Sequence, residues 1–203
     1  MARQTRSQET VRRAREEAYR GLILEAAERI FGDKGYAEAK VQEIAEAAGV
    51  ATGTVYGIFP SKQELYRAIH RETLEQLAKR YAEIPTLERA ASDVMLDRVA
   101  VSTRFLTEHP DYLRMYLREA SRWGFDASEL PAGAMAFTDL ELYARGVAEG
   151  DLIEEDPEVI QQLAMTAGQV FLHQWWKAGM HESPDALIAR IKAHYRSALF
   201  RSR

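Results

Sequence analysis

The chain has 203 residues, of which 46% are hydrophobic and 29% charged, a composition typical of a soluble globular protein with one or two domains. It contains no cysteine and no apolar run close to the ~18 residues of a membrane span, which excludes disulfides and thiolate metal sites and favours a cytoplasmic protein. The net charge of −4 is divided unevenly: residues 1–80 carry 14 Lys or Arg against 12 Asp or Glu, whereas residues 81–203 carry 13 against 19, so only the N-terminal part suits contact with a polyanion.

Residues 1–19 form a basic N-terminal arm in which arginines outnumber glutamates. One interpretation is an arm that follows a DNA backbone or reaches the minor groove, and the other is a solvated, disordered tail. Both remain open at this stage. The charged residues of the first twenty positions are Arg3, Arg6, Arg12, Arg13, Arg15 and Arg20, opposed by Glu9, Glu16 and Glu17.

Residues 22–58 show the spacing of three helices. Leu22, Ile23, Ala26, Ala27, Ile30 and Phe31 mark one face of a first helix, which we expect to end between Gly32 and Gly35. Two short helices follow, one from Val41 and one from Thr52 to Ile58, joined at Gly49, which tolerates the positive φ that a tight turn needs. This spacing predicts a helix-turn-helix whose second helix enters a DNA major groove.

The same stretch resembles the motif of the TetR family of bacterial transcriptional regulators. Three positions depart from that motif, because Lys40 replaces a usual threonine, Ala51 a usual serine, and Gly57-Ile58 a pair that is commonly aromatic or histidine. These departures concern contact details rather than the motif as a whole. The matching residues, in order, are Ile44, Ala45, Ala48, Gly49, Val50, Gly53, Thr54, Tyr56, Phe59, Ser61, Lys62 and Leu65.

Six residues of this region are candidate DNA contacts. The hydroxyls of Thr52, Thr54 and Tyr56 suit bases or phosphates, and a glycine lets the backbone come close to the duplex. Each residue also has a plainer interpretation: Thr52 caps the helix, Gly53 only eases packing, and Lys62 is solvated. The set is Lys40, Thr52, Gly53, Thr54, Tyr56 and Lys62. Val55, Ile58 and Phe59 are expected in the core.

The whole pattern is helical, and we predict an all-α fold of about nine helices, the count that the resemblance implies. Ser61 to Glu64 reads as a capping box that opens a fourth helix through about Ala82. Five more helices are expected over residues 87–108, 112–123, 131–150, 157–179 and 184–201. The expected domains are the arm (1–19), a DNA-binding domain (20–66) whose connecting helix continues to about residue 82, and an effector-binding and dimerisation domain (67–203).

The last two helices are apolar on more than one face, which indicates either a dimer interface or an internal core. The family uses two helices per subunit in a four-helix dimer interface, so the resemblance implies a homodimer. The residues expected to face the partner are Ala164, Ala167, Gly168, Leu187, Ile191 and Tyr195.

The resemblance also implies a cavity in the body for a small apolar or amphipathic effector. Aromatic residues there suit such a pocket, although they equally suit any helical core. The expected lining is Phe105, Tyr116, Trp123, Phe137, Tyr143, Phe171, His173 and Trp175.

Enzyme chemistry has little support in the sequence. The five histidines lie on separate segments without the four-residue spacing of a helical metal site, so no catalytic residue, metal or cofactor is predicted. The expected function is a repressor that leaves a palindromic operator when its effector binds. The alternatives are a constitutive DNA-binding regulator and, from another class, an all-helical small-molecule carrier or enzyme.

Overall fold

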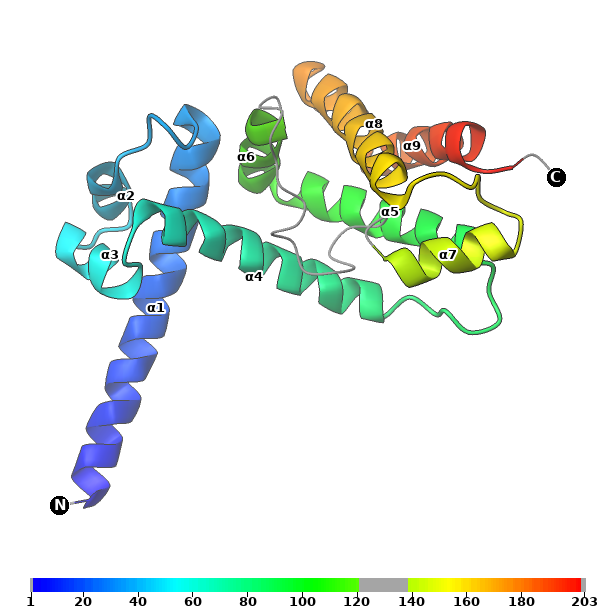
Figure 1. The fold of residues 1–203 in the computed structure, drawn as a ribbon. Helices are drawn as coiled ribbons and strands as arrows, with labels where there is room; N and C mark the ends of the chain where they lie inside the picture. The colour runs from blue at the N-terminus through cyan, green and yellow to red at the C-terminus, as the bar shows by residue number, and fades with distance from the viewer. Residues whose placement is uncertain (1, 121–138, 202–203) are drawn as a thin grey trace.

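The first helix is much longer than the sequence predicts. A computed structural model describes the backbone of residues 2–120 and 139–201, and α1 (Ala2–Lys34) includes residues 2–19 of the basic arm (Figure 1). The helix ends at Gly35, whose φ of 80° is readily adopted only by glycine. Gly32 therefore lies inside the helix and does not end it, because a single glycine weakens a helix without stopping it.

Two short helices complete the N-terminal head. In α2 (Val41–Ala47) Ile44 is fully buried, and in α3 (Thr52–Ile58) Val55 is buried, both within the same hydrophobic core as α1. The turn between them is made at Gly49, with φ of 66°, and is closed by a hydrogen bond from the Val50 amide to the Ala45 carbonyl (2.9 Å). The predicted helix-turn-helix geometry is therefore present.

The fourth helix joins the head to the rest of the chain. The hydroxyl of Ser61 accepts a hydrogen bond from the Glu64 amide (3.1 Å), which caps the start of α4 (Lys62–Ala82), as the capping box predicted. Figure 1 shows α4 leaving the head and running beneath α5. This helix therefore connects the head with the body.

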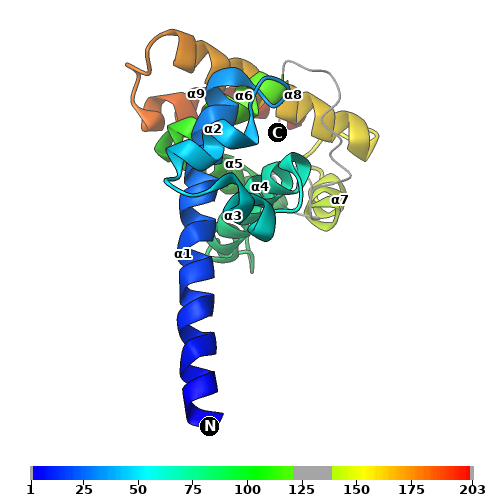
Figure 2. The ribbon, with the colours of Figure 1, turned by 90° about the vertical axis from the view of Figure 1, so that its left-hand side faces the viewer.

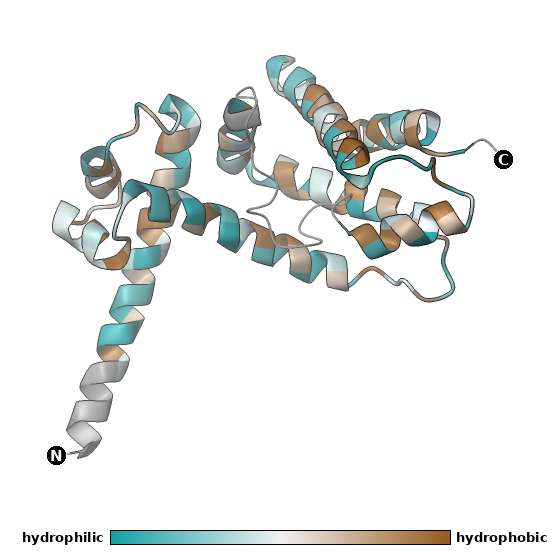
Figure 3. Cartoon of the chain, in the orientation of Figure 1, coloured by the Kyte–Doolittle hydropathy of each residue, from teal (hydrophilic) through white to brown (hydrophobic). Residues whose placement is uncertain are grey.

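The body consists of α5 (Ala91–Glu108), α6 (Pro110–Ala120), α7 (Leu140–Ala148), α8 (Pro157–Lys177) and α9 (Pro184–Leu199). Its hydrophobic residues gather along α5, α7 and α8 (Figure 3). The side chains of Asp139, Asp156 and Ser183 cap the helices that follow them. All regular secondary structure in the described ranges is helical, apart from a single bridge between Leu152 and Phe200, so the predicted all-α fold of nine helices is confirmed there.

One predicted boundary differs for a clear reason. We expected a helix from Leu87, but α5 begins at Ala91, and Leu87 is an exposed loop residue. Glu88 adopts a φ of 57°, which no right-handed helix allows.

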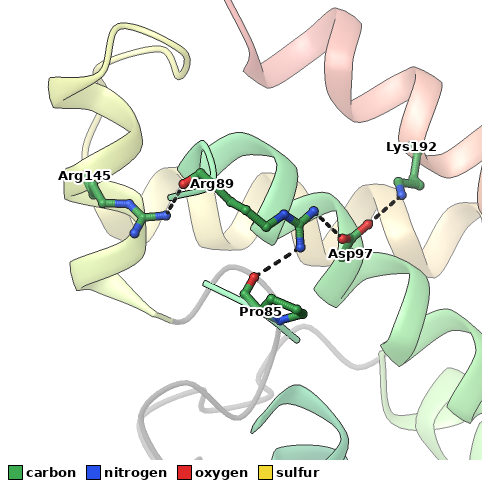
Figure 4. Close-up of polar contacts among 5 residues, drawn as sticks. All are labelled: Pro85, Arg89, Asp97, Arg145 and Lys192. Atoms are coloured by element: carbon green, nitrogen blue, oxygen red, sulfur yellow. Dashed lines mark hydrogen bonds and ion pairs between the residues drawn. The ribbon is translucent and has the colours of Figure 1, made fainter. Parts of the chain in front are cut away.

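A network of charged side chains anchors this loop to the body (Figure 4). Arg89 donates to the Pro85 carbonyl (3.1 Å) and to the Asp97 carboxylate (2.6 Å), which also receives Lys192 of α9 (3.2 Å). Arg145 of α7 donates in turn to the Arg89 carbonyl (3.1 Å). Burial alone raises the pKa of Asp97, but the hydrogen bonds from Arg89 and Lys192 outweigh it and hold the pKa below its usual value.

The head and body also meet through α1 and α6. Gly32 lies so close to α6 that an added Cβ would stand 3.0 Å from the Asp111 carbonyl oxygen. Arg118 donates to the carbonyls of Gly32 (3.1 Å) and Asp33 (2.7 Å), and Arg114 pairs with the Asp33 carboxylate. These cations lie at the negative end of the α1 dipole, which favours the contact.

The described part of the chain contains neither a membrane-spanning helix nor a cluster of metal-binding side chains. None of its helices has the length and apolar character needed to cross a membrane. No group of three or more His, Asp or Glu side chains is placed there to hold a metal ion.

Candidate nucleic-acid interface

The outer face of α3 is almost bare. Gly53, Tyr56 and Gly57 follow the i, i+3, i+4 spacing of one helix face, and all three are exposed, Tyr56 by 46%. A Cβ added at Gly53 or Gly57 would meet nothing within 4 Å. Packing within the chain therefore does not require these glycines, and the face offers backbone and one tyrosine ring to a close partner.

Neighbouring polar residues of the head are less exposed. Thr52 and Thr54 are half-buried, while Lys40 is exposed at the start of α2. The residue that caps α3 is Ala51, and no side chain makes the capping hydrogen bond, so Thr52 does not cap the helix. The hydroxyls of both threonines thus remain candidates for contact with DNA.

The structure revises our expectation for Lys62. Its Nζ donates to three carbonyl oxygens, those of Tyr36 (2.7 Å), Ala37 (3.2 Å) and Ala39 (3.0 Å), and lies over the Tyr36 ring. An ammonium group has three hydrogens, so all are used inside the head. Lys62 ties the loop before α2 to the start of α4, and a direct phosphate contact would require breaking these bonds.

Other contacts hold α3 in place from behind. Phe59, at the end of α3, is buried, and the Arg20 guanidinium lies 4.8 Å from its ring centroid. The same guanidinium donates to Glu72 of α4 (2.5 Å). On α2, a hydrogen bond from Lys34 to Glu43 (2.9 Å) lowers the pKa of that carboxyl group. A helix of seven residues is too short to be stable alone, so these neighbours define its orientation.

The predicted effector-pocket residues make different contacts in separate parts of the body. Phe105 is buried against Leu77 and Tyr81 and stacks on His109, with ring centroids 4.1 Å apart. Tyr116 is buried and accepts a hydrogen bond from Gln169 (3.3 Å).

Four further pocket candidates have structural partners or face outward. The Tyr143 hydroxyl accepts from the Glu155 amide (3.1 Å), and the Trp175 indole donates to the Glu182 carbonyl (2.8 Å), so both fix loops. Phe171 is half-buried beside His194, and His173 is exposed on α8. Trp123 and Phe137 lie outside the described residues. The prediction of one pocket lined by all eight residues therefore remains untested.

A surface pocket of about 310 Å³ lies elsewhere, at the start of α5. Its walls are largely polar and share no residue with the predicted effector pocket. They include Ser92, Asp93, Asp151, Arg196, Phe200 and Arg201.

The predicted dimer contacts require a correction. Ala164, Leu187, Ile191 and Tyr195 are buried inside the chain itself and are not available to a partner. The Tyr195 hydroxyl donates to the Ala164 carbonyl (2.5 Å) and would meet a Cβ at Gly168 at 3.0 Å, so the small residues of α8 accommodate α9. Ala167, like Gly168, is half-buried.

A different stripe of α8 is exposed. Val159, Leu163 and Val170 are 45%, 52% and 50% exposed, and with Thr166 and His173 they follow alternating four- and three-residue steps. That is the spacing of a helix packing seam. The sequence contains the residues of this stripe, but α8 is apolar on several faces. Only the packing of α9 against α8 shows which of these faces is buried and which is exposed.

Comparison with known proteins gives matches centred on the head. Residues 23–69 match the family described as bacterial regulatory proteins, tetR family. The regulator TtgR of Pseudomonas putida is 45% identical over 74 residues, 34% of this chain and 35% of TtgR. The uncharacterized regulator YuxN of Bacillus subtilis is 31% identical over 100 residues, 49% of this chain but only 34% of YuxN, so the chain matches about a third of these two relatives.

Other similarities extend over the body. The transcriptional repressor KstR2 of Mycolicibacterium smegmatis is 24% identical over 165 residues, which cover 79% of this chain and 80% of KstR2. Among solved structures, the fatty acid degradation regulator FadR from Bacillus halodurans has a TM-score of 0.70 at 20% identity and covers 86% of this chain and 92% of its own. The ketosteroid transcriptional regulator KstR2 of Mycobacterium tuberculosis has a TM-score of 0.65 at 21% identity, over 90% and 95%.

Proposed function

We propose that this chain, whose residues 23–69 match the tetR family of bacterial regulatory proteins, is a DNA-binding transcriptional regulator that acts from α3 in the major groove. The observation that carries the proposal is the bare outer face of α3, where Gly53 and Gly57 leave open space around Tyr56. Such a face permits close backbone approach to a duplex. A regulator of this kind acts in the cytoplasm, where the bacterial DNA lies.

We assign different roles to the six candidate residues. Tyr56 and Thr54 contact bases or the thymine methyl, and Gly53 allows the approach. Thr52 and Lys40 contact phosphates, which position the head on the duplex without reading its sequence. Lys62 acts indirectly, by holding the loop in front of α2.

The test uses an operator selected by the protein from a random-sequence duplex pool. Tyr56→Ala is expected to weaken operator binding by about 1 to 3 kcal/mol while leaving non-specific binding nearly unchanged. Tyr56→Phe separates the ring from the hydroxyl, and Leu87→Ala, on an exposed loop far along the chain, is the matched control. Operator affinity of Tyr56→Ala equal to that of the parent would refute the placement of α3.

A homodimer is the second part of the proposal. One seven-residue helix provides few contacts, and two copies bound to half-sites about 34 to 36 Å apart supply the missing affinity. The exposed stripe of α8 that contains Leu163 and Val170 is the surface that we assign to the partner subunit. Leu163→Glu should make the protein monomeric in analytical ultracentrifugation without loss of helicity, and a dimer that persists would exclude this surface.

The body is proposed to bind a small apolar or amphipathic effector that releases the protein from DNA. Inside it Tyr81, Tyr116 and Tyr195 are buried, and burial raises the pKa of each hydroxyl above its usual value. Buried aromatic rings with polar tips suit an amphipathic molecule. KstR2 is described as a transcriptional repressor and a ketosteroid transcriptional regulator, and FadR as a fatty acid degradation regulator; these descriptions favour this class of ligand and a repressor role.

Thermal denaturation with ketosteroids and with fatty acids of increasing chain length tests the effector proposal. A ligand that stabilises the free protein should also weaken operator binding, because the two couplings are reciprocal. If no compound raises the unfolding temperature, the constitutive regulator becomes the better description, and DNA binding stands.

A further inference from the structure

The N-terminal part of α1 continues beyond the head as a projecting helix, which we call the projecting segment and define as residues 2–19. Figures 1 and 2 show it extending past α3, on the side opposite α2, in both views. Eighteen helical residues span about 27 Å. Every residue from Thr10 to Ala18 is exposed. Residues 10–18 therefore bury no hydrophobic face against the rest of the molecule.

Composition indicates which kind of partner fits this segment. Between Thr10 and Ala18 Val11 is the one large apolar residue, too little for a seam between two helices. Residues 2–19 carry five arginines against three glutamates. A net positive, hydrophilic helix suits the phosphates of a nucleic acid better than a second protein surface.

The register of α1 shows which arginine faces the DNA-binding side. Arg20 lies over Phe59, at the end of α3, and pairs with Glu72. Arg13 is seven residues earlier, which is close to two helical turns, so it lies on the same face of α1. No acidic or aromatic side chain among residues 10–118 and 139–201 pairs with Arg13.

Two neighbouring arginines lie on another face and have partners within the helix. Arg12 pairs with Glu16 (3.7 Å), and Arg15 donates to the Tyr19 hydroxyl (2.8 Å). Because each helical residue turns by about 100°, Arg12 points well away from the line of Arg13 and Arg20. Among the arginines of the segment whose side chains the structure describes, Arg13 lies on the α3 side without a described partner, and the chemically identical Arg12 lies on a different side.

We propose that the projecting segment lies along the phosphate backbone beside the groove that α3 occupies, with Arg13 contacting a phosphate. This inference rests on the proposed DNA-binding function and adds a second contact surface to it. The phosphate contact is independent of base sequence, so it strengthens operator and non-specific binding alike and makes both more sensitive to salt. Binding would also stabilise a helix that is marginal when it projects alone into water.

The experiment compares Arg13→Gln with the matched variant Arg12→Gln in the full chain. Affinity for the selected operator, in a duplex of about 30 base pairs that holds two half-sites about 10 base pairs apart, is measured from 50 to 200 mM salt. Log affinity falls as log salt rises, and Arg13→Gln should make this slope less steep by about 0.9 per subunit. The fold-loss of affinity between 50 and 200 mM salt should therefore be smaller by a factor of about 3.5 for each contact removed. Arg12→Gln should leave the slope at the parent value, and Arg13→Lys should restore it.

Each other outcome contradicts the proposal in its own way. Equal changes in the two glutamine variants would show a general charge effect, and unchanged slopes in both would show a solvated segment. A dimer that loses its assembly on Arg13→Gln would mean that the segment binds a second copy of the chain. A parent protein that binds no duplex would refute the proposed function as well, whereas tight binding with no difference between Arg13 and Arg12 refutes only this inference.

Discussion

The head and the body differ in where their large side chains lie: the head exposes one on α3, whereas the body buries several between its long helices. In the head, α2 and α3 have seven residues each, and the outer face of α3 leaves Tyr56 exposed among glycines. In the body, α8 and α9 have 21 and 16 residues, and Trp175, Leu187 and Tyr195 are buried between them and their neighbours. The surface of the head is set by its short local motif, whereas that of the body depends on how long helices pack.

This difference explains how the two regions respond to change. A head whose contacts lie on an exposed face loses binding without unfolding when one of them is removed. A body whose helices are covered on several faces loses stability first.

The largest effect is expected from the core of the body. Leu187 is fully buried, so Leu187→Ala should lower the free energy of unfolding by about 2 to 5 kcal/mol, through lost burial and the cavity left behind. Leu163→Ala removes the same atoms from an exposed position and should leave the intrinsic stability of the subunit nearly unchanged. Urea denaturation of both variants decides this, and equal losses would contradict the assignment of inner and outer faces.

The second prediction concerns the junction between head and body. His70 of α4 contacts the Tyr112 hydroxyl of α6 through Nδ1 (3.0 Å) and packs against the Tyr66 ring, and burial lowers its pKa to about 4. The unfolded chain has a histidine pKa near 6.5, so as the pH falls it binds the proton first. Stability is therefore lost between about pH 6.5 and 4, on the order of 2 to 3 kcal/mol in total, and nothing is lost above pH 7.

The variant His70→Asn isolates this contribution, since its amide can take the place of Nδ1 and does not titrate. Glu28, whose pKa burial and Asp111 raise, acts in the opposite sense at acidic pH and is present in both proteins. The difference between parent and variant in unfolding free energy should fall as the pH is lowered. A constant difference from pH 7 to 4 would show that His70 takes up a proton in the folded protein as readily as in the unfolded chain.

The smallest effect is expected at Lys62. Lys62→Met removes the hydrogen bonds to the carbonyls of Tyr36, Ala37 and Ala39 and should cost about 1 to 2 kcal/mol of stability. Operator binding should weaken with an unchanged salt slope, because no phosphate contact is lost. A slope that falls by about 0.9 per subunit would instead restore the direct phosphate role that the sequence suggested.

Much of the architecture was predictable because it depends on neighbours in sequence. The turn at Gly49 and the capping of α4 by Ser61 follow from conformations and hydrogen bonds within a few residues. The length of α1 was not predictable in this way, since a polar segment without an apolar face resembles a disordered tail.

Local spacing, turn chemistry and one motif were enough to predict the all-α class, the helix-turn-helix and the similarity of residues 23–69 to the tetR family. Only the tertiary structure decided that Leu187 and Tyr195 lie inside the subunit while Leu163 lies outside, and that the Lys62 ammonium is bound to a loop 23 to 26 residues away. It also decided that Asp97 binds both Arg89 and Lys192, the second of which lies 95 residues further along the chain. Burial and long-range hydrogen bonds arise from the relative placement of helices, which periodicity within one helix cannot specify.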